Sequence, residues 1–119
     1  CFHTICFFFS CDLHFSVNPY PVQIDGTEIL MEWIAVTGED KHPLYRELTT
    51  AMPGAVGEKA EHRAKLEGYG LPANQDPEVL WNFEKFLVAR NGEVVGRFAP
   101  SLTPDDERLT TAVEREVAK

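Results

Sequence analysis

The 119-residue sequence has few cysteines, an excess of acidic over basic residues and no long apolar run. Three cysteines are too few for a disulfide framework and favour a reducing, cytoplasmic compartment. Lys and Arg number 11 against 19 Asp and Glu, and the net charge of −8 argues against nucleic acid as a partner. The densest apolar run, residues 5–9, is far shorter than the roughly 20 residues of a membrane span. It also has no preceding Lys or Arg, which argues against a secretory signal.

The cysteines and aromatic residues are unevenly placed. All three cysteines and the apolar run Phe7-Phe8-Phe9 lie in the first 15 residues, and the sequence has no initiator Met. Two interpretations remain open: a truncated chain, or a buried strand or helix end that belongs to the same domain. We therefore predict an atypical N-terminal segment over residues 1–29 and the main domain over residues 30–119.

The N-terminal segment also raises the question of a metal site, formed by Cys1, Cys6, Cys11, His3 and His14. Residues five apart differ by roughly 140° around a helix and point to opposite faces of a strand. The cysteines would therefore converge only with a loop arranged for the purpose, and no C-x-x-C pair is present, so a zinc site is not expected.

The middle of the sequence predicts alternating strands and helices. Turn residues favour a loop over residues 16–28, and the following apolar residues favour a strand over residues 29–36. Pro43 suits the first turn of a helix that buries Leu44, Tyr45 and Leu48 and ends before Pro53. A charged second helix is expected over residues 55–67, followed by an irregular loop to residue 77.

The C-terminal third predicts a hairpin and a final helix. Strands are expected over residues 83–89 and 93–98, joined by a two-residue turn at Asn91-Gly92, with Arg90 and Glu93 as an opposite-charge pair beside it. Thr103 is expected to cap a helix whose buried stripe is formed by Leu109, Val113 and Val117. These elements together predict an α/β fold with helices that cover a small sheet.

Trp81 and Asn82 are the candidate site residues. They stand where the long loop reaches the hairpin, and their side-chain N–H groups could face a nearby anion such as a thiolate. From composition alone, a core anchor and a turn cap are the commoner roles of a Trp and an Asn at these positions. His42 and His62 have no Ser or Cys partner at a recognisable spacing, so solvated or capping roles are expected for both.

Several blocks of the sequence resemble the glutathione peroxidase family. The family's C-terminal signature is similar to residues 81–88 (WNFEKFLV), 91–95 (NGEVV) and 97–100 (RFAP). Residues 38–48 (GEDKHPLYREL) resemble the helix after the family's central strand, and residues 34–36 (IAV) resemble the end of that strand. The resemblance covers about residues 30–119.

The resemblance implies a thioredoxin-like fold, here incomplete because the N-terminal βαβ part is lacking. It implies antioxidant reduction of hydrogen peroxide or organic hydroperoxides at a Cys or selenocysteine, with external glutathione or thioredoxin as reductant and no bound cofactor. The family's catalytic Trp and Asn correspond to Trp81 and Asn82. The insertion over residues 51–77 is similar to the longer loop of oligomer-forming members, which implies a homo-oligomer.

The sequence departs from the family at the nucleophile. The family's peroxidatic motif, Asn-Val-Ala-Ser followed by Cys or selenocysteine and Gly, is absent, and Gln23 and Gln75 lie in unrelated contexts. Two hypotheses follow. The first is a peroxidase family member represented by its C-terminal portion, with little or no activity of its own. The second is a non-catalytic thioredoxin-like interaction module that binds a partner through an uncovered sheet edge or the aromatic N-terminus.

Overall fold

The computed structural model describes residues 6–7, 20–24, 27–31 and 35–119, and its elements confirm the predicted α/β class. The strands form a three-stranded antiparallel sheet, β1-β4-β5, and a separate two-stranded sheet, β2-β3. None of the described helices is long and apolar enough to cross a bilayer. In chain order the elements are β1 (Cys6–Phe7), β2 (Tyr20–Ile24), β3 (Thr27–Met31), α1 (Pro43–Ala51), α2 (Lys59–Gly68), β4 (Lys85–Val88), β5 (Val94–Phe98) and α3 (Glu107–Val117).

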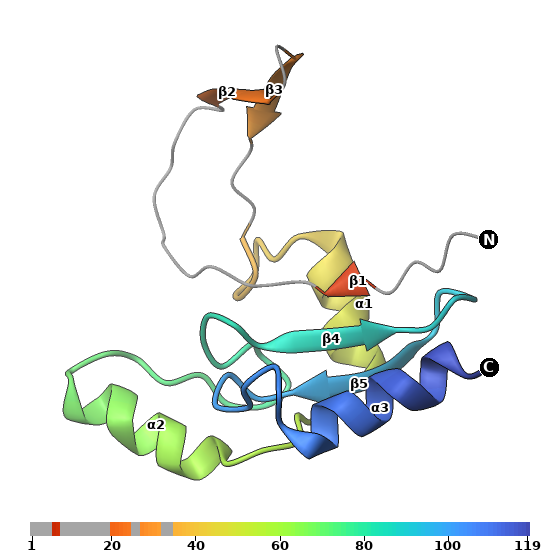
Figure 1. Ribbon diagram of the computed structural model, residues 1–119. Coiled ribbons are helices and arrows are strands. Elements are labelled where there is room, and N and C mark those ends of the chain that lie inside the picture. Colours follow the sequence, from red (N-terminus) through yellow and green to blue (C-terminus); the bar gives the residue numbers. More distant parts are fainter. Residues whose placement is uncertain (1–5, 8–19, 25–26, 32–34) are drawn as a thin grey trace.

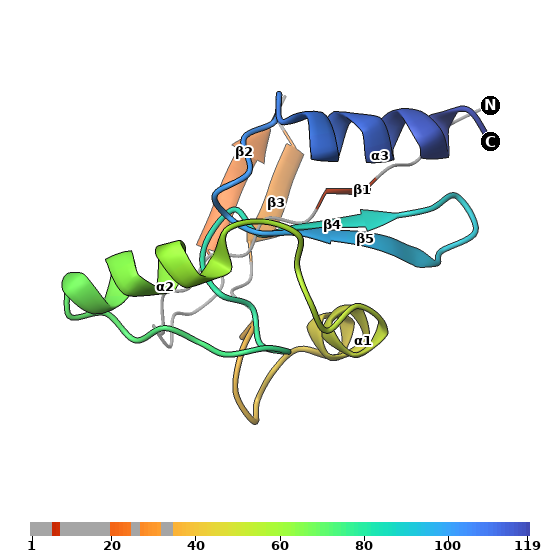
Figure 2. The ribbon, with the colours of Figure 1, turned by 90° about the horizontal axis from the view of Figure 1, so that it is seen from below.

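Helices α1 and α3 lie on opposite faces of the three-stranded sheet, as Figures 1 and 2 show. On the α1 face, Phe86 of β4 packs with Tyr45 and Leu48, and the Tyr45 and Phe86 rings meet edge to face. On the α3 face, Leu87 packs with Leu109. Alternate residues of β4 thus supply two separate cores, as expected for a strand covered on both sides.

A β-bulge in the hairpin decides which residues of β5 face each helix. Leu87 pairs with Gly96 but Val88 pairs with Val94, so Val95 is the extra residue. Val94 packs in the α1 core and Val95 in the α3 core. The bulge then shifts the alternation by one position, which turns the side chain of Arg97 to the α1 face, over Phe86.

The observed bounds of α1 agree with the prediction, whereas the observed start of α2 does not. Helix α1 begins at Pro43 and ends at Ala51, as predicted, and Nδ1 of His42 caps it by accepting from the Leu44 amide at 3.2 Å. Helix α2 begins at Lys59, four residues later than predicted. The residues before it add to the sheet edge instead, because Val56 forms a parallel bridge with Phe98 of β5.

The start of α3 was predicted wrongly. Thr103 does not cap it: the helix begins at Glu107, and the Asp106 carboxylate accepts from the Arg108 amide at 2.9 Å. The amide of Asp106 donates to the Thr103 carbonyl at 3.0 Å, so residues 103–106 form a separate turn.

The buried stripe of α3 is also shorter than predicted. Leu109 is buried and Val113 half-buried, but Val117 is 47% exposed. Ala112, which was not predicted, also packs against the core on this face. Contact with the sheet therefore ends before the last turn of the helix.

Within the predicted loop over residues 16–28, the described residues 20–24 and 27–28 instead belong to the β2-β3 hairpin, in which Ile24 pairs with Thr27. Figure 1 shows this hairpin apart from the three-stranded sheet. Pro21 is tolerated because both strands of a two-stranded sheet are edge strands, and Asp-Gly is a hairpin sequence as well as a loop signal. The expected strand over residues 29–36 appears only as the part of β3 up to Met31, residues 32–34 lie outside the described residues, and Ala35 and Val36 are not in a strand.

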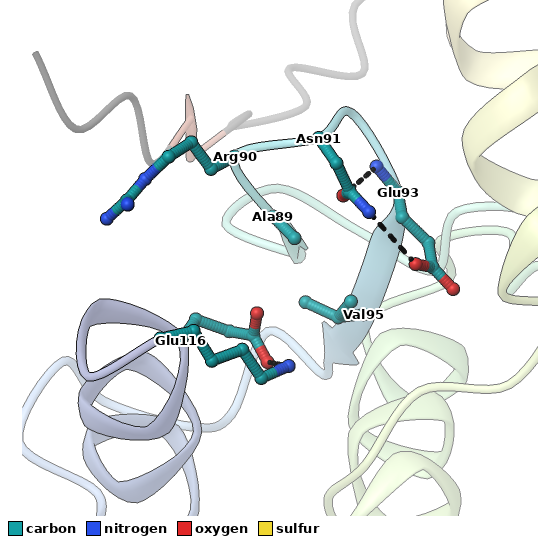
Figure 3. A pocket seen from close by; sticks show the side chains of 7 residues that line it. Ala89, Arg90, Asn91, Glu93, Val95 and Glu116 are labelled. Carbon is teal, nitrogen blue, oxygen red and sulfur yellow. Dashed lines mark hydrogen bonds and ion pairs between the residues drawn. The ribbon is translucent and has the colours of Figure 1, made fainter.

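The turn between β4 and β5 differs from the predicted two-residue turn. The Gly92 amide donates to the Ala89 carbonyl at 2.9 Å, and of Asn91 and Gly92 only Gly92 has a positive φ, of 88°. These features indicate a three-residue loop over residues 90–92. The predicted Arg90–Glu93 pair does not form: the Glu93 carboxylate accepts from Asn91, and Arg90 points away (Figure 3).

Candidate active site

The tripeptide Trp81-Asn82-Phe83 forms a surface turn immediately before β4. Val79 and Leu80, which precede it, are 0% and 2% exposed and anchor the chain in the core. Trp81 and Asn82 are half-buried, whereas Phe83 is 62% exposed. The predicted position of Trp81 and Asn82, where the long loop reaches the hairpin, is confirmed.

The backbone of this turn has an unusual conformation. Phe83 has a φ of 64°, the left-handed region, which bulky side chains rarely adopt. The Glu84 carboxylate closes the turn, because its Oε2 accepts from the Leu80 amide at 2.7 Å. A short ring from Leu80 to Glu84 thus contains both candidate catalytic residues.

Glu84 is in turn held by a buried arginine. Nε of Arg97 donates to Oε1 of Glu84 at 2.5 Å, and each side chain is only 1% exposed. The guanidinium also lies over the Phe86 ring, 5.0 Å from its centroid. Its remaining N–H groups donate, at 2.9–3.0 Å, to the carbonyl oxygens of Met52, Pro53, Pro77 and Glu78. Buried charges need this degree of pairing, since an unpaired one is costly.

A second ion pair fixes the segment that leads into the turn. The Glu78 carboxylate pairs with the buried Lys41 and accepts from the Gly38 amide at 3.1 Å. Nδ2 of Asn74 donates to the Val79 carbonyl at 2.8 Å. The chain on the N-terminal side of Trp81 is therefore tied to the residues before α1.

Lys85, the next residue after Glu84, faces the α3 side of the sheet. Its Nζ donates to the carbonyl oxygens of Leu102 at 2.5 Å and Pro100 at 3.4 Å. Burial lowers the pKa of this amine, and the neighbouring Glu84 carboxylate opposes the shift. Lys85 thus connects β4 to the turn that precedes α3.

The two histidines behave differently. The capping role expected for His42 is confirmed, whereas the solvated or capping role expected for His62 is wrong. Nε2 of His62 is buried, with no hydrogen-bond partner among the described residues. Burial lowers the pKa of His62, Lys65 lowers it further and Glu84 acts in the opposite direction. The neutral imidazole is therefore favoured at neutral pH.

The sequence interpretation missed Glu84 and Arg97 as site residues. A signal was present: Arg97 lies within the apolar run of residues 94–98, and Glu84, of opposite charge, directly precedes the first strand of the hairpin. A charge in such a run is normally buried only with a partner. Pairing the two strands would have placed Arg97 opposite Phe86, close to Glu84.

The candidate nucleophiles and metal ligands of the N-terminal segment cannot be compared with this geometry. The side chains of Cys1, Cys6, Cys11, His3 and His14 lie outside the described residues. Within the described part of the chain, no group of three or more His, Cys, Asp or Glu residues could hold a metal ion. The described site therefore consists of the Trp81-Asn82 turn and the charged residues that support it.

Comparison with known proteins relates this site to a family. No protein-family model matches the sequence. The thioredoxin/glutathione peroxidase BtuE of Escherichia coli is 41% identical over 87 residues, which are 72% of this chain and 48% of that protein. A glutathione peroxidase homolog of Neisseria meningitidis serogroup B is 40% identical over 83 residues, or 68% of this chain and 47% of that protein.

A solved structure gives the same result for the fold. The crystal structure of Trgpx in its apo form is 33% identical and superimposes with a TM-score of 0.52, covering 80% of this chain and 50% of that one. The chain thus spans about half the length of the relatives it matches. With similar sequence and a similar thioredoxin-like arrangement, the chain belongs to the glutathione peroxidase family.

Proposed function

We propose that residues 30–119 are the C-terminal part of a thiol peroxidase domain that reduces hydrogen peroxide or organic hydroperoxides, with Trp81 and Asn82 as its catalytic N–H donors. The observation that carries this proposal is the turn at residues 81–83. Two consecutive half-buried residues there carry an indole and an amide, on a backbone whose following charged residue, Glu84, belongs to a buried ion pair. Prearranged donors of this kind stabilise an anion at little reorganisation cost.

The proposed chemistry requires a thiolate or selenolate beside these donors. N–H groups aimed at the anion stabilise it over the neutral thiol and so lower its pKa. The anion attacks one peroxide oxygen, forming a sulfur–oxygen bond as the oxygen–oxygen bond breaks, and the departing oxygen takes up a proton. Two external thiol groups then reduce the resulting sulfenic acid, releasing water and leaving a disulfide.

The length of the chain relative to its relatives, and the motif that the sequence lacks, support assigning this activity to a longer domain. The chain covers about half of its curated relatives, and the sequence contains no peroxidatic Asn-Val-Ala-Ser-Cys-Gly motif. We therefore propose that the first βαβ unit of the thioredoxin-like fold lies outside residues 30–119, that residues 1–29 are an atypical segment, and that the 119-residue chain has little or no turnover by itself.

The test measures peroxide-dependent oxidation of glutathione and of thioredoxin by the purified chain. We expect no turnover above the background given by the Trp81→Phe and Asn82→Ala variants. Robust turnover that disappears when Cys1, Cys6 or Cys11 is replaced would overturn the proposal that the chain is inactive.

The coding sequence upstream of Cys1 provides a second test of the proposed peroxidase activity. A Cys or selenocysteine codon in the peroxidatic motif there is expected. If that sequence continues without any such motif, the peroxidase proposal fails.

A non-catalytic interaction module is the second candidate, and the free edge of β5 favours it. Among the described residues, β5 pairs with β4 on one side, and on the other side only the Val56 bridge reaches it, at Phe98. An unpaired strand edge can accept a strand from another chain. Under this alternative Trp81→Phe and Asn82→Ala leave partner binding unchanged, whereas the enzyme proposal requires both to lower activity in the complete domain.

Compartment, reductant and assembly remain part of the proposal. Three cysteines support a reducing, cytoplasmic location, where glutathione and thioredoxin are both available. The relative in Escherichia coli has both reductants in its name, thioredoxin/glutathione peroxidase. The residue 51–77 insertion, which includes α2, supports a homo-oligomer. Sedimentation equilibrium of the purified chain would test this oligomeric state.

A further inference from the structure

The turn that carries Trp81 and Asn82 combines a strained backbone with a buried charge. A non-glycine residue at positive φ, here Phe83, costs of the order of 1 kcal/mol or more and persists only where the surroundings over-determine it. The next residue, Glu84, has a carboxylate with both oxygens engaged, one with the Leu80 amide and one with Arg97. The strained residue thus lies inside the ring that this carboxylate closes.

We propose that Glu84 is a positioning residue: its carboxylate, fixed by Arg97, holds the Leu80–Glu84 ring closed and so sets the orientation of Trp81 and Asn82. This proposal deepens the proposed function and rests on it for its catalytic meaning. The positioning itself is a property of the described residues alone.

Arg97 can fix the carboxylate because the guanidinium cannot move. Its N–H groups reach the carbonyls of Met52 and Pro53, just past the end of α1, and those of Pro77 and Glu78, before the turn. A guanidinium donates in a rigid planar fork, so five acceptors define its place closely. The carboxylate is thereby positioned relative to α1 and to the segment that leads into Trp81.

The two contacts of Glu84 require a carboxylate and not merely a side chain of that shape. Both oxygens accept, one from a backbone N–H and one from a guanidinium N–H. A Gln at this position has one acceptor and one NH₂ group, so it satisfies only one of the two donors. The charge-assisted contact with Arg97 is the stronger. We therefore expect the Leu80 contact to be lost in Glu84→Gln, which opens the ring and releases Phe83.

The experiment uses the fluorescence of Trp81 in the 119-residue chain. The sequence has two Trp residues, so Trp33→Phe leaves Trp81 as the single emitter. In that background Glu84→Gln is compared with Glu114→Gln, a matched change at an exposed position of α3. We expect a red-shifted Trp81 emission and a larger acrylamide quenching constant for Glu84→Gln alone, at a temperature at which circular dichroism shows every variant folded. Unchanged emission and quenching in folded Glu84→Gln would overturn the proposal.

A measurement on the unmodified chain covers the case in which Glu84→Gln does not fold. The Leu80 amide is expected to exchange its hydrogen only through opening of the ring, and so to be protected in spite of its place beside a surface turn. Exchange of Leu80 at the unprotected rate would also overturn the proposal. Neither readout depends on turnover, so a failure of the peroxidase proposal leaves both results interpretable.

Discussion

Nε of Arg97 lies 2.5 Å from Oε1 of Glu84, and the two side chains are each 1% exposed. This contact joins β5 to the residue that ends the Trp81-Asn82 turn. The same guanidinium also reaches the chain just past α1 and the segment before the turn. One buried ion pair therefore connects the candidate site to β5, to Phe86 in the core on the α1 face and to the chain just past α1.

Removal of either partner of this pair is expected to be strongly destabilising. Glu84→Leu leaves the Arg97 charge buried, and we expect it to lower the free energy of unfolding by about 3–5 kcal/mol. Arg97→Met is expected to cost at least as much, because it also leaves four carbonyl oxygens without their donor. Urea unfolding measures both, with the exposed Arg115→Met as control. Losses for both variants as small as that of the control would contradict this account.

We expect a larger residue at position 96 to destabilise the fold, because neighbouring side chains pack closely around Gly96. A Cβ at this position would lie 2.9 Å from the Phe98 ring and 3.3 Å from Cβ of Leu87, so Gly96→Ala is expected to lower the melting temperature. Gly68, at the end of α2, has no atom within 4 Å of the same added carbon. Gly68→Ala should therefore raise stability by about 0.4–1 kcal/mol. Thermal unfolding of the two variants decides the matter, and equal effects would show that packing at Gly96 is not limiting.

The cap of α3 gives a prediction that separates the observed helix start from the predicted one. Asp106→Ala removes the carboxylate that accepts from Arg108 and should lower the melting temperature, whereas Thr103→Ala should change it less. The hydrogen bonds from Arg108 hold the pKa of Asp106 at about 2. A lowered carboxyl pKa contributes stability above the unfolded value, which is lost as the pH falls toward the folded one. The difference between wild type and Asp106→Ala should therefore persist to about pH 4 and shrink below it. A larger effect of Thr103→Ala would favour the predicted cap.

Protonation of His62 is expected to lower the stability of the folded chain in mild acid. Burial lowers its pKa in the folded chain below the ordinary value of 6.5, so the unfolded chain binds a proton more readily. Stability then falls as the pH decreases through 6.5 and is fully present above it. Urea unfolding between about pH 8 and about pH 5.5 should show this decrease in the wild type and a smaller one in His62→Phe. The same pH dependence in both proteins would exclude His62 as its source.

Local sequence features predicted much of the fold correctly. Pro43 fixes the start of α1 and Pro53 its end, and the apolar runs on either side of Asn91-Gly92 predict β4 and β5. The start of α3 was misplaced because Thr103 and Asp106 are both good caps, and only packing selects between them. The β2-β3 hairpin was missed because Asp-Gly and Pro indicate turns and edge strands alike.

The sequence by itself determined that Trp81 and Asn82 stand side by side before a strand, and its signature blocks determined the family. Tertiary structure alone decided what holds these residues. Arg97 is 13 residues from Glu84 and 45 from Met52, so no local pattern records their contact. The bulge at Val95 decides that Arg97 faces Glu84 at all, since an unbroken alternation from Val94 would turn it to the α3 face. A buried guanidinium needs acceptors from several segments, and only the folded chain brings them together.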